Sequence, residues 1–125
     1  MKKLKYVIQK HDASHLHYDL RLEINGTARS WAIPKEPSKE EGIKRLAIQV
    51  EDHDIDYMDF EGKIPKGQYG AGSVKIWDKG HWKPEYIDNK KIIAIIDGKK
   101  LKGKFTLIHF KDKNWLFFKT REVKE

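Results

Sequence analysis

The stretch from residue 15 to residue 24, with the sequence HLHYDLRLEI, alternates strictly between polar and apolar side chains. Successive side chains of a β-strand point to opposite faces, whereas a helix brings together residues three or four apart. A strand therefore separates the two sets completely, and a helix would mix them. Asn25-Gly26 follows directly and is a strong signal for a tight hairpin turn. We predict a strand over residues 15–24 with one face in a hydrophobic core.

The polar face of this predicted strand carries an unusual row of side chains: His15, His17, Asp19, Arg21 and Glu23. Alternate residues lie roughly 6.5 to 7 Å apart along a strand, so the tips of neighbouring side chains can converge. Imidazole and carboxylate groups could then share one divalent ion, with the guanidinium holding an anion beside it. From the pattern alone, a polar barrel lining or a solvated sheet face is an equally good interpretation.

A third candidate ligand, His11, lies six residues before His17. We predict a strand over residues 4–9, with Tyr6 and Ile8 on one face, and then a short polar connection that contains His11. A loop folding back over the start of the next strand would place His11 beside His17 and Asp19. Sets of this nitrogen and oxygen type hold divalent metals that catalyse reactions on phosphates.

The composition limits the class of protein. A length of 125 residues suggests a single domain spanning residues 1–125. The absence of cysteine excludes disulfides, cysteine-based zinc sites and thiol catalysis. No apolar run approaches the roughly 20 residues of a membrane span, and the basic N-terminus lacks the apolar segment of a signal peptide. We therefore expect a cytoplasmic protein without a membrane association.

The charge balance points to a polyanionic partner. Lys and Arg total 26 against 19 acidic residues, a formal net charge of +7. Such a surplus favours nucleic acid as the partner. A lysine-rich surface that serves solubility or thermostability is the alternative.

Further alternation and turn signals predict more short strands, at residues 27–33, 45–53, 73–78, 90–96, 103–110 and 115–119. We expect Leu46, Ile48 and Val50 to face the core, and Tyr69 to pack inward from a glycine-rich turn over residues 64–72. Residues 78–80 are predicted to form a turn, and Ser38 to cap a single helical turn. Many short strands without a long amphipathic helix favour a mainly β fold, a compact closed or nearly closed barrel.

Four residues outside the row are candidates for chemistry. His53 ends a predicted strand and can give or take a proton near neutral pH, and Glu51 on the same face could orient it. Tyr57 could donate a hydrogen bond to a phosphate oxygen, and Lys35 lies at a strand rim. Taken singly, His53, Tyr57 and Lys35 each have a structural alternative: a hydrogen-bonding histidine, a packed loop anchor and a surface lysine, respectively.

Five ordered motifs carry a resemblance to a known family. They are QKHDASHLHYDLRLE, SWAIPK, KRLAIQVEDH, DYMDFEGKIP and GQYGAGSVKIWDKG. Together they resemble the 3′-phosphoesterase domain of bacterial ATP-dependent DNA ligase D and its stand-alone archaeal versions. The match is close over about residues 6–80 and looser beyond.

The resemblance implies a β-barrel with a few short helices and a crescent-shaped active-site groove. It implies a Mn²⁺-dependent enzyme that removes a 3′-terminal ribonucleoside from DNA and then hydrolyses the remaining 3′-phosphate to a 3′-OH. By motif position, the metal ligands are His11, His17 and Asp19, and Arg21 and His53 contact the scissile phosphate. Further residues required for one or both steps match Lys35, Arg45, Glu51 and Tyr57. His53 would stabilise the transition state or protonate the leaving oxygen.

The resemblance also implies partners: DNA primer-template 3′ ends, a separate DNA ligase, a polymerase or primase, and Ku. Family members fused in ligases carry an N-terminal extension, and this chain starts just before the first strand. We therefore expect the phosphodiesterase step to be the weaker one. His15 is expected at the groove or behind the ligands, and a monomer is the simplest state.

Alternatives to this function remain at this point. One is a basic barrel that binds nucleic acid without catalysis, and another is a metallohydrolase acting on RNA or on a small phosphoester. The ligand types also suit Zn²⁺ or Co²⁺ in place of Mn²⁺.

Overall fold

The computed structural model describes residues 3–122, which form an all-β fold with one 3₁₀ helix and, within that range, no α-helix. The elements follow in the order β1 (Leu4–Asp12), β2 (Leu16–Ile24), β3 (Thr27–Ile33), β4 (Arg45–His53), η1 (Ile55–Asp59), β5 (Gly62–Ile64), β6 (Gly72–Ile87), β7 (Lys91–Gly98), β8 (Lys102–Lys111) and β9 (Asn114–Lys119). None of the helical structure in this part of the chain is long and apolar enough to span a bilayer.

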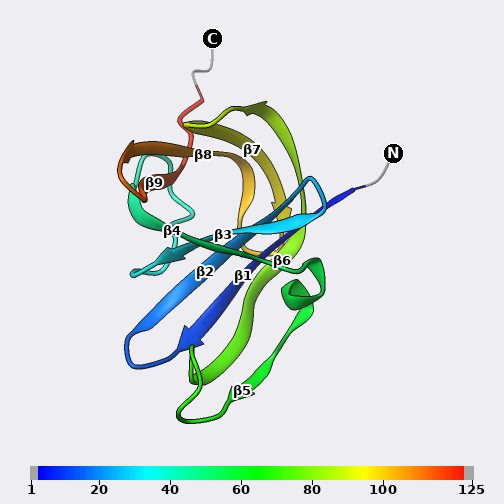
Figure 1. Cartoon of the computed structure of the whole chain (residues 1–125). Coiled ribbons are helices and arrows are strands. Elements are labelled where there is room, and N and C mark those ends of the chain that lie inside the picture. Colours follow the sequence, from blue (N-terminus) through cyan, green and yellow to red (C-terminus); the bar gives the residue numbers. More distant parts are fainter. Residues whose placement is uncertain (1–2, 123–125) are drawn as a thin grey trace.

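The strands form a closed barrel. Their order in the sheet is β1-β2-β3-β4-β9-β8-β7-β6-β5, with antiparallel pairs, and β1 also pairs with β6. Eight strands therefore close into a ring, while β5 lies outside it on the edge of β6, next to η1 (Figure 1). Closure leaves the ring without a free edge. The predicted β-barrel is confirmed, although only one short helix occurs in the described residues.

The interior of the barrel is apolar and follows the predicted alternation. Tyr6 and Ile8 of β1 and Leu20 and Leu22 of β2 are buried in one core cluster, as is Trp31 of β3. The turn between β2 and β3 has the expected geometry, since Asn25 and Gly26 have φ values of 51° and 80°. Two positive φ values are what a type I′ hairpin turn requires.

The inward face of β4 differs from the prediction. Ala47 is fully buried, whereas Leu46 is 39% exposed. Ala47 pairs with Trp115 of β9, whose large side chain fills the core. The small residue therefore faces inward because its neighbour occupies the volume that a leucine would take.

The predicted turn at residues 78–80 is wrong, because β6 runs through it without interruption. Asp78 is buried, and its carboxylate accepts hydrogen bonds from the Tyr6 hydroxyl and from three backbone N–H groups of residues 99–101. Gly80 serves close packing, since a Cβ there would lie 2.0 Å from the Asp97 carbonyl oxygen. The helical turn predicted at Ser38 is also absent, since its hydroxyl only accepts a bond from Glu40 N–H within an irregular segment.

The buried Tyr6–Asp78 pair makes the fold sensitive to alkaline pH. Burial, and then the charge and hydrogen bond of Asp78, raise the pKa of Tyr6 well above its usual value of 10.0. Above pH 10 the unfolded chain loses this proton and the folded chain keeps it, so stability falls as pH rises. From pH 9 to pH 11 we expect wild type to lose about 1.4 kcal/mol more unfolding free energy than Tyr6→Phe. Urea unfolding followed by tryptophan fluorescence measures the unfolding free energy of each protein at the two pH values. An equal decrease in wild type and Tyr6→Phe would contradict the prediction.

Candidate metal centre

The polar row of β2 lies on the outer face of the barrel, and η1 packs against part of this face. Met58 of η1 forms a small second core there with Val7 and Ala28. Asp59 at the end of η1 contacts the ammonium groups of Lys5 at 2.7 Å and Lys79 at 3.4 Å. η1 thus covers the part of the row around Arg21, whose guanidinium carbon lies 4.9 Å from the Tyr57 ring centroid, whereas His15 at the other end is exposed.

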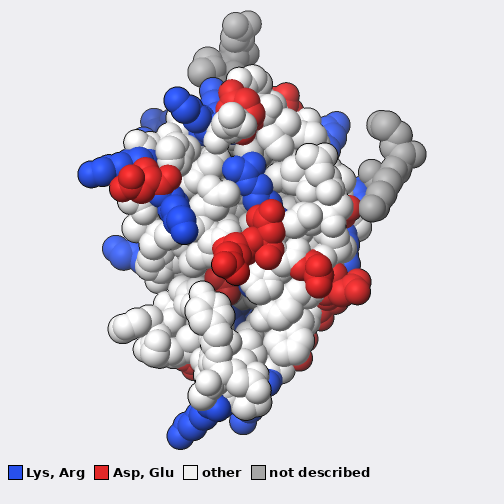
Figure 2. Space-filling model, in the orientation of Figure 1, with Lys and Arg blue, Asp and Glu red and all other residues white. Residues whose placement is uncertain are grey.

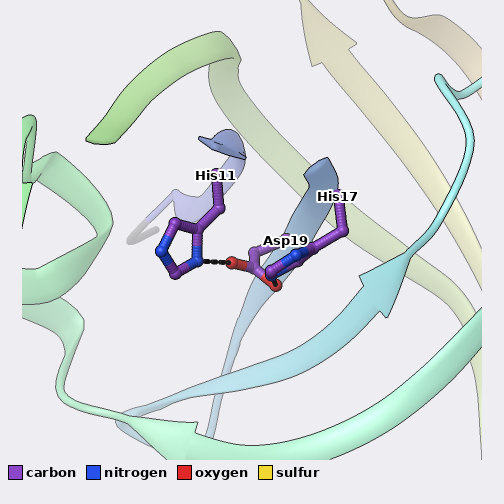
Figure 3. A group of neighbouring side chains, drawn as sticks. All are labelled: His11, His17 and Asp19. Carbon is purple, nitrogen blue, oxygen red and sulfur yellow. Dashed lines mark ion pairs between the residues drawn. The ribbon is translucent and has the colours of Figure 1, made fainter. Parts of the chain in front are cut away.

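His11, His17 and Asp19 come together at one end of the row (Figure 3). His11 Nδ1 lies 3.5 Å from Asp19 Oδ2, and His17 Nε2 lies 3.3 Å from Asp19 Oδ1. One ligand atom from each residue lies within 4.8 Å of the others. The three residues lie together as the sequence predicted, but the secondary structure that brings His11 to the other two differs from the prediction. His11 is part of β1, not of a loop, and pairs directly across from His17 in the β1–β2 register.

Backbone carbonyls fix the orientation of both imidazoles. His11 Nε2 lies 2.7 Å from the Gly70 carbonyl oxygen, and His17 Nδ1 lies 2.9 Å from the His15 carbonyl oxygen. A carbonyl only accepts, so these nitrogens carry the protons in the neutral rings, which leaves His11 Nδ1 and His17 Nε2 as the ligand atoms that face Asp19. On His17 this second nitrogen bonds to Asp19 when it carries a proton and is available to a cation when it does not. Carbonyl partners of this kind commonly hold metal-ligating histidines. The donor set therefore fits a divalent cation.

The electrostatics of the group also favour a cation. The hydrogen bond to Asp19 raises the pKa of His17, although burial acts against it. Burial alone would raise the pKa of Asp19, but the bond with His17 and the charge of Arg21 outweigh it and hold the pKa below its usual value. The group thus attracts positive charge, whether carried by a proton or by a metal ion.

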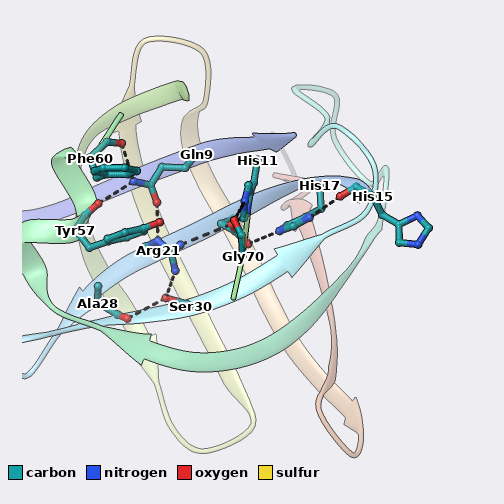
Figure 4. Close-up of polar contacts among 11 residues, drawn as sticks. Gln9, His11, His15, His17, Arg21, Ala28, Ser30, Tyr57, Phe60 and Gly70 are labelled. Atoms are coloured by element: carbon teal, nitrogen blue, oxygen red, sulfur yellow. Dashed lines mark hydrogen bonds and ion pairs between the residues drawn. The ribbon is translucent and has the colours of Figure 1, made fainter. Parts of the chain in front are cut away.

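Arg21 is buried and held in place beside the three candidate ligands (Figure 4). Its Nε donates to Gln9 Oε1 at 2.6 Å and a terminal nitrogen donates to Ser30 Oγ at 2.7 Å. The other terminal nitrogen lies 3.6 Å from Asp19. Burial lowers the pKa of Arg21, and Asp19 opposes that shift. A guanidinium oriented in this way is suited to hold a phosphate oxygen.

An aromatic stack flanks the guanidinium. The rings of His53 and Tyr57 lie 4.6 Å apart, and Tyr57 stacks in turn on Phe60 at 5.1 Å. The guanidinium carbon of Arg21 lies 4.9 Å from the Tyr57 ring centroid. Burial, followed by the charge of Arg21, lowers the pKa of His53, while Asp19, Asp54 and Glu51 act against that change.

These groups line one hollow of about 380 Å³, which we call the site hollow. Its lining includes His11, His17, Asp19, Arg21, His53 and Tyr57. Glu51 and Asp52 also belong to it. Figure 2 shows Asp and Glu side chains near the middle of one face and along one side of it, with a basic side chain beside the middle group. Acidic groups beside the ligands would repel a phosphate unless a cation neutralises them.

Two of the predicted site residues lie outside the site hollow. Lys35 is exposed and is not part of the lining, and Arg45 uses its Nε to hold the Glu36 carbonyl oxygen at 2.8 Å. The side chain of His15 is exposed and points away from the ligands, so only its carbonyl contributes (Figure 4). Glu51 lies in the lining, exposed to solvent. The catalytic roles of Lys35, Arg45 and Glu51 remain predictions.

Sequence reasoning missed several residues that support the site. Gln9 accepts a hydrogen bond from Arg21 and donates one to the Tyr57 carbonyl oxygen at 2.8 Å. Ser30 accepts a second hydrogen bond from the same guanidinium. Gln9 and His11 are two residues apart, so a strand continued through His11 would have placed both on one face. The Gly70 carbonyl gave no signal in the sequence, because its contact with His11 spans 59 positions.

The fold and the site together define a β-barrel protein with a candidate divalent-metal centre and an adjoining buried arginine. A family model described as the DNA Ligase D 3′-phosphoesterase domain matches residues 9–109. The chain belongs to this family.

Several long bacterial proteins are similar to the chain. It is 48% identical over 128 residues to the multifunctional non-homologous end joining protein LigD of Pseudomonas aeruginosa, with 95% of the chain covered. The corresponding LigD proteins of Mycolicibacterium smegmatis and Mycobacterium tuberculosis are 44% and 39% identical, each over 96% of the chain. The chain spans only 15 to 17% of the length of these relatives.

Proposed function

We propose that the protein is a metal-dependent phosphoesterase that processes DNA 3′ ends. It would first remove a 3′-terminal ribonucleoside, leaving a 3′-phosphate, and then hydrolyse that phosphate to a 3′-OH. The observation that carries the proposal is the convergence of ring nitrogens of His11 and His17 and of the Asp19 carboxylate beside the buried Arg21. Family membership and the net charge of +7 support DNA as the substrate.

His11, His17 and Asp19 would hold the metal, which we propose to be Mn²⁺, with Co²⁺ or Zn²⁺ as substitutes at the same ligands. When bound, the ion supplies Lewis-acid stabilisation of charge on the phosphoryl group. Arg21 would hold a second phosphoryl oxygen in a fixed orientation, because Gln9 and Ser30 set its plane.

His53 and Tyr57 would act at the other side of the phosphate. The lowered pKa of His53 favours a neutral ring that donates a hydrogen bond to a phosphoryl oxygen over a general acid. Tyr57 can donate from its hydroxyl, since burial raises its pKa and keeps it protonated. Glu51 lies in the lining and could orient His53. Lys35 and Arg45, which lie outside the site hollow, would instead contact the DNA strand away from the reacting phosphate.

In the cell we propose a cytoplasmic monomer that prepares 3′ ends for repair by end joining. A 3′-OH is the chemical form that a ligase or polymerase extends, so the implied partners are a separate DNA ligase, a polymerase or primase, and Ku. This setting follows from the names of the LigD relatives and from the family, and it is part of the proposal.

Metal removal gives the direct test. A labelled primer-template with one 3′-terminal ribonucleotide should be shortened to a 3′-phosphate and then to a 3′-OH in Mn²⁺, and should stay intact in EDTA. Denaturing electrophoresis separates the three species. Conversion of a preformed 3′-phosphate alone would restrict the function to the second step. Salt-sensitive binding without product in Mn²⁺, Co²⁺ or Zn²⁺ would overturn the proposal and indicate a nucleic-acid-binding barrel.

A further inference from the structure

Tyr69 is a large aromatic residue at the site that the proposed chemistry does not use. Its side chain was predicted to pack inward, and this is wrong, because the residue is 101% exposed. It nevertheless lines the site hollow together with His11, His53 and Tyr57. Within residues 3–122 it has no hydrogen bond, ion pair or ring contact. A tyrosine ring held in water at the rim of a site leaves both of its faces free for a ligand.

The loop that carries Tyr69 has a defined shape. Gly67 and Gly70 flank the segment with φ values of +87° and +76°, which side chains rarely adopt. Backbone bonds of 3.3 Å from Gln68 N–H to the Pro65 carbonyl and 3.1 Å from Ala71 N–H to the Gln68 carbonyl close the turn. These features hold the backbone on both sides of Tyr69.

The same loop is tied to the candidate metal ligands. The Gly70 carbonyl, next in the chain to Tyr69, accepts the hydrogen bond from His11 Nε2 at 2.7 Å. The side chain of Tyr69 therefore begins one residue from a group that orients a metal ligand. A nucleotide with its phosphate at the ligands would extend its sugar and base toward the rim of the site hollow.

We propose that Tyr69 is a stacking platform for the nucleobase of the 3′-terminal nucleotide, an inference that rests on the proposed function. Aromatic side chains bind bases of nucleic-acid strands through stacking, which tolerates sequence because every base has a π-face. Tyr69 would thus position any 3′ end, while the ligands and Arg21 act on its phosphate. It contributes to substrate binding and not to the chemical step.

Kinetics on matched oligonucleotides test the role. One substrate ends in a 3′-phosphorylated adenine nucleotide, and the other ends in the same nucleotide without its base. For the adenine substrate we expect Tyr69→Ala to raise KM about 5- to 100-fold with kcat changed less than about 3-fold, the range that base–aromatic stacking provides. For the abasic substrate KM should change little. Tyr69→Trp should keep wild-type KM on both.

The control variant is Tyr86→Ala. Tyr86 is another exposed tyrosine, at 47%, which lies on β6 outside the site hollow. Tyr86→Ala should leave KM and kcat unchanged for both substrates. If Tyr69→Ala raised KM equally for the adenine and the abasic substrates, the stacking proposal would be overturned, and the loop would have a purely structural role. Unchanged KM on the adenine substrate would overturn it as well.

A binding measurement separates this inference from the proposed function. An oligonucleotide with 3′-terminal 2-aminopurine and a 3′-phosphate should lose fluorescence on binding, because stacking quenches the base. Tyr69→Ala should abolish the quenching while anisotropy still reports binding. If wild type quenches the probe but hydrolyses nothing, the phosphoesterase proposal fails and stacking stands. If wild type hydrolyses the end without quenching, stacking fails alone.

Discussion

Replacing His17 with alanine is expected to lower hydrolysis of 3′-phosphate and 3′-ribonucleotide ends by about 1,000-fold or more. The variant removes one of three groups whose ligand atoms lie within 4.8 Å of one another. A bound metal provides several kcal/mol of stabilisation to charge on a phosphoryl group, and each 1.36 kcal/mol is a factor of ten in rate. Initial rates with saturating Mn²⁺ measure the loss, and calorimetric titration with Mn²⁺ should show weakened metal binding.

The matched control for this change is His15→Ala. Its imidazole is exposed and points away from the ligands, and only its backbone carbonyl contacts His17, which alanine retains. We expect wild-type rates and an unaltered affinity for Mn²⁺. DNA binding in EDTA should survive in both variants, since it depends on distributed cationic groups. Full activity in His17→Ala would show that the three residues do not hold the catalytic metal.

The outline of this site could be predicted because strand alternation is a local property. Period two alone places His17, Asp19 and Arg21 on one face of β2, and the structure keeps that order. The cover over this face could not be predicted in the same way. It comes from η1, whose Met58 meets Val7 and Ala28 from distant parts of the chain. The candidate metal ligands and Arg21 could therefore be identified in the sequence, whereas the burial around Arg21 could not.

The errors in the fold have a common physical origin in contacts between distant residues. Asp78-Lys79-Gly80 has the composition of a turn, yet it continues β6 because Asp78 binds the backbone of residues 99–101. Tyr69 is a large aromatic residue of the kind that usually packs inward, yet it is exposed. Its loop is held by backbone hydrogen bonds within residues 65–71 and by the contact of the Gly70 carbonyl with His11. In both cases one of the contacts involved joins segments far apart in the sequence, which no short window contains.

The largest loss of stability is expected for Asp78→Ala. The side chain of Asp78 is 3% exposed and accepts four hydrogen bonds, at 2.9 Å from the Tyr6 hydroxyl and at 2.8, 2.9 and 2.9 Å from the N–H groups of residues 99, 100 and 101. Alanine leaves these donors without their acceptor in the interior, at about 1 to 3 kcal/mol for each group that water cannot reach. We expect a loss of about 4 kcal/mol in the free energy of unfolding, measured by urea denaturation.

The control for this variant is Asp97→Ala on the adjoining strand β7. Asp97 has a side chain 81% exposed, and its contact with Lys102 measures 3.8 Å, so we expect a change below about 0.5 kcal/mol. A loss in Asp78→Ala as small as in this control would mean that the donors find water or other partners. In that case the β7–β8 turn does not depend on the carboxylate. The expected large loss would instead establish that an aspartate inside a strand joins β1, β6 and the β7–β8 turn. The barrel would then close around a buried polar contact as well as around its apolar core.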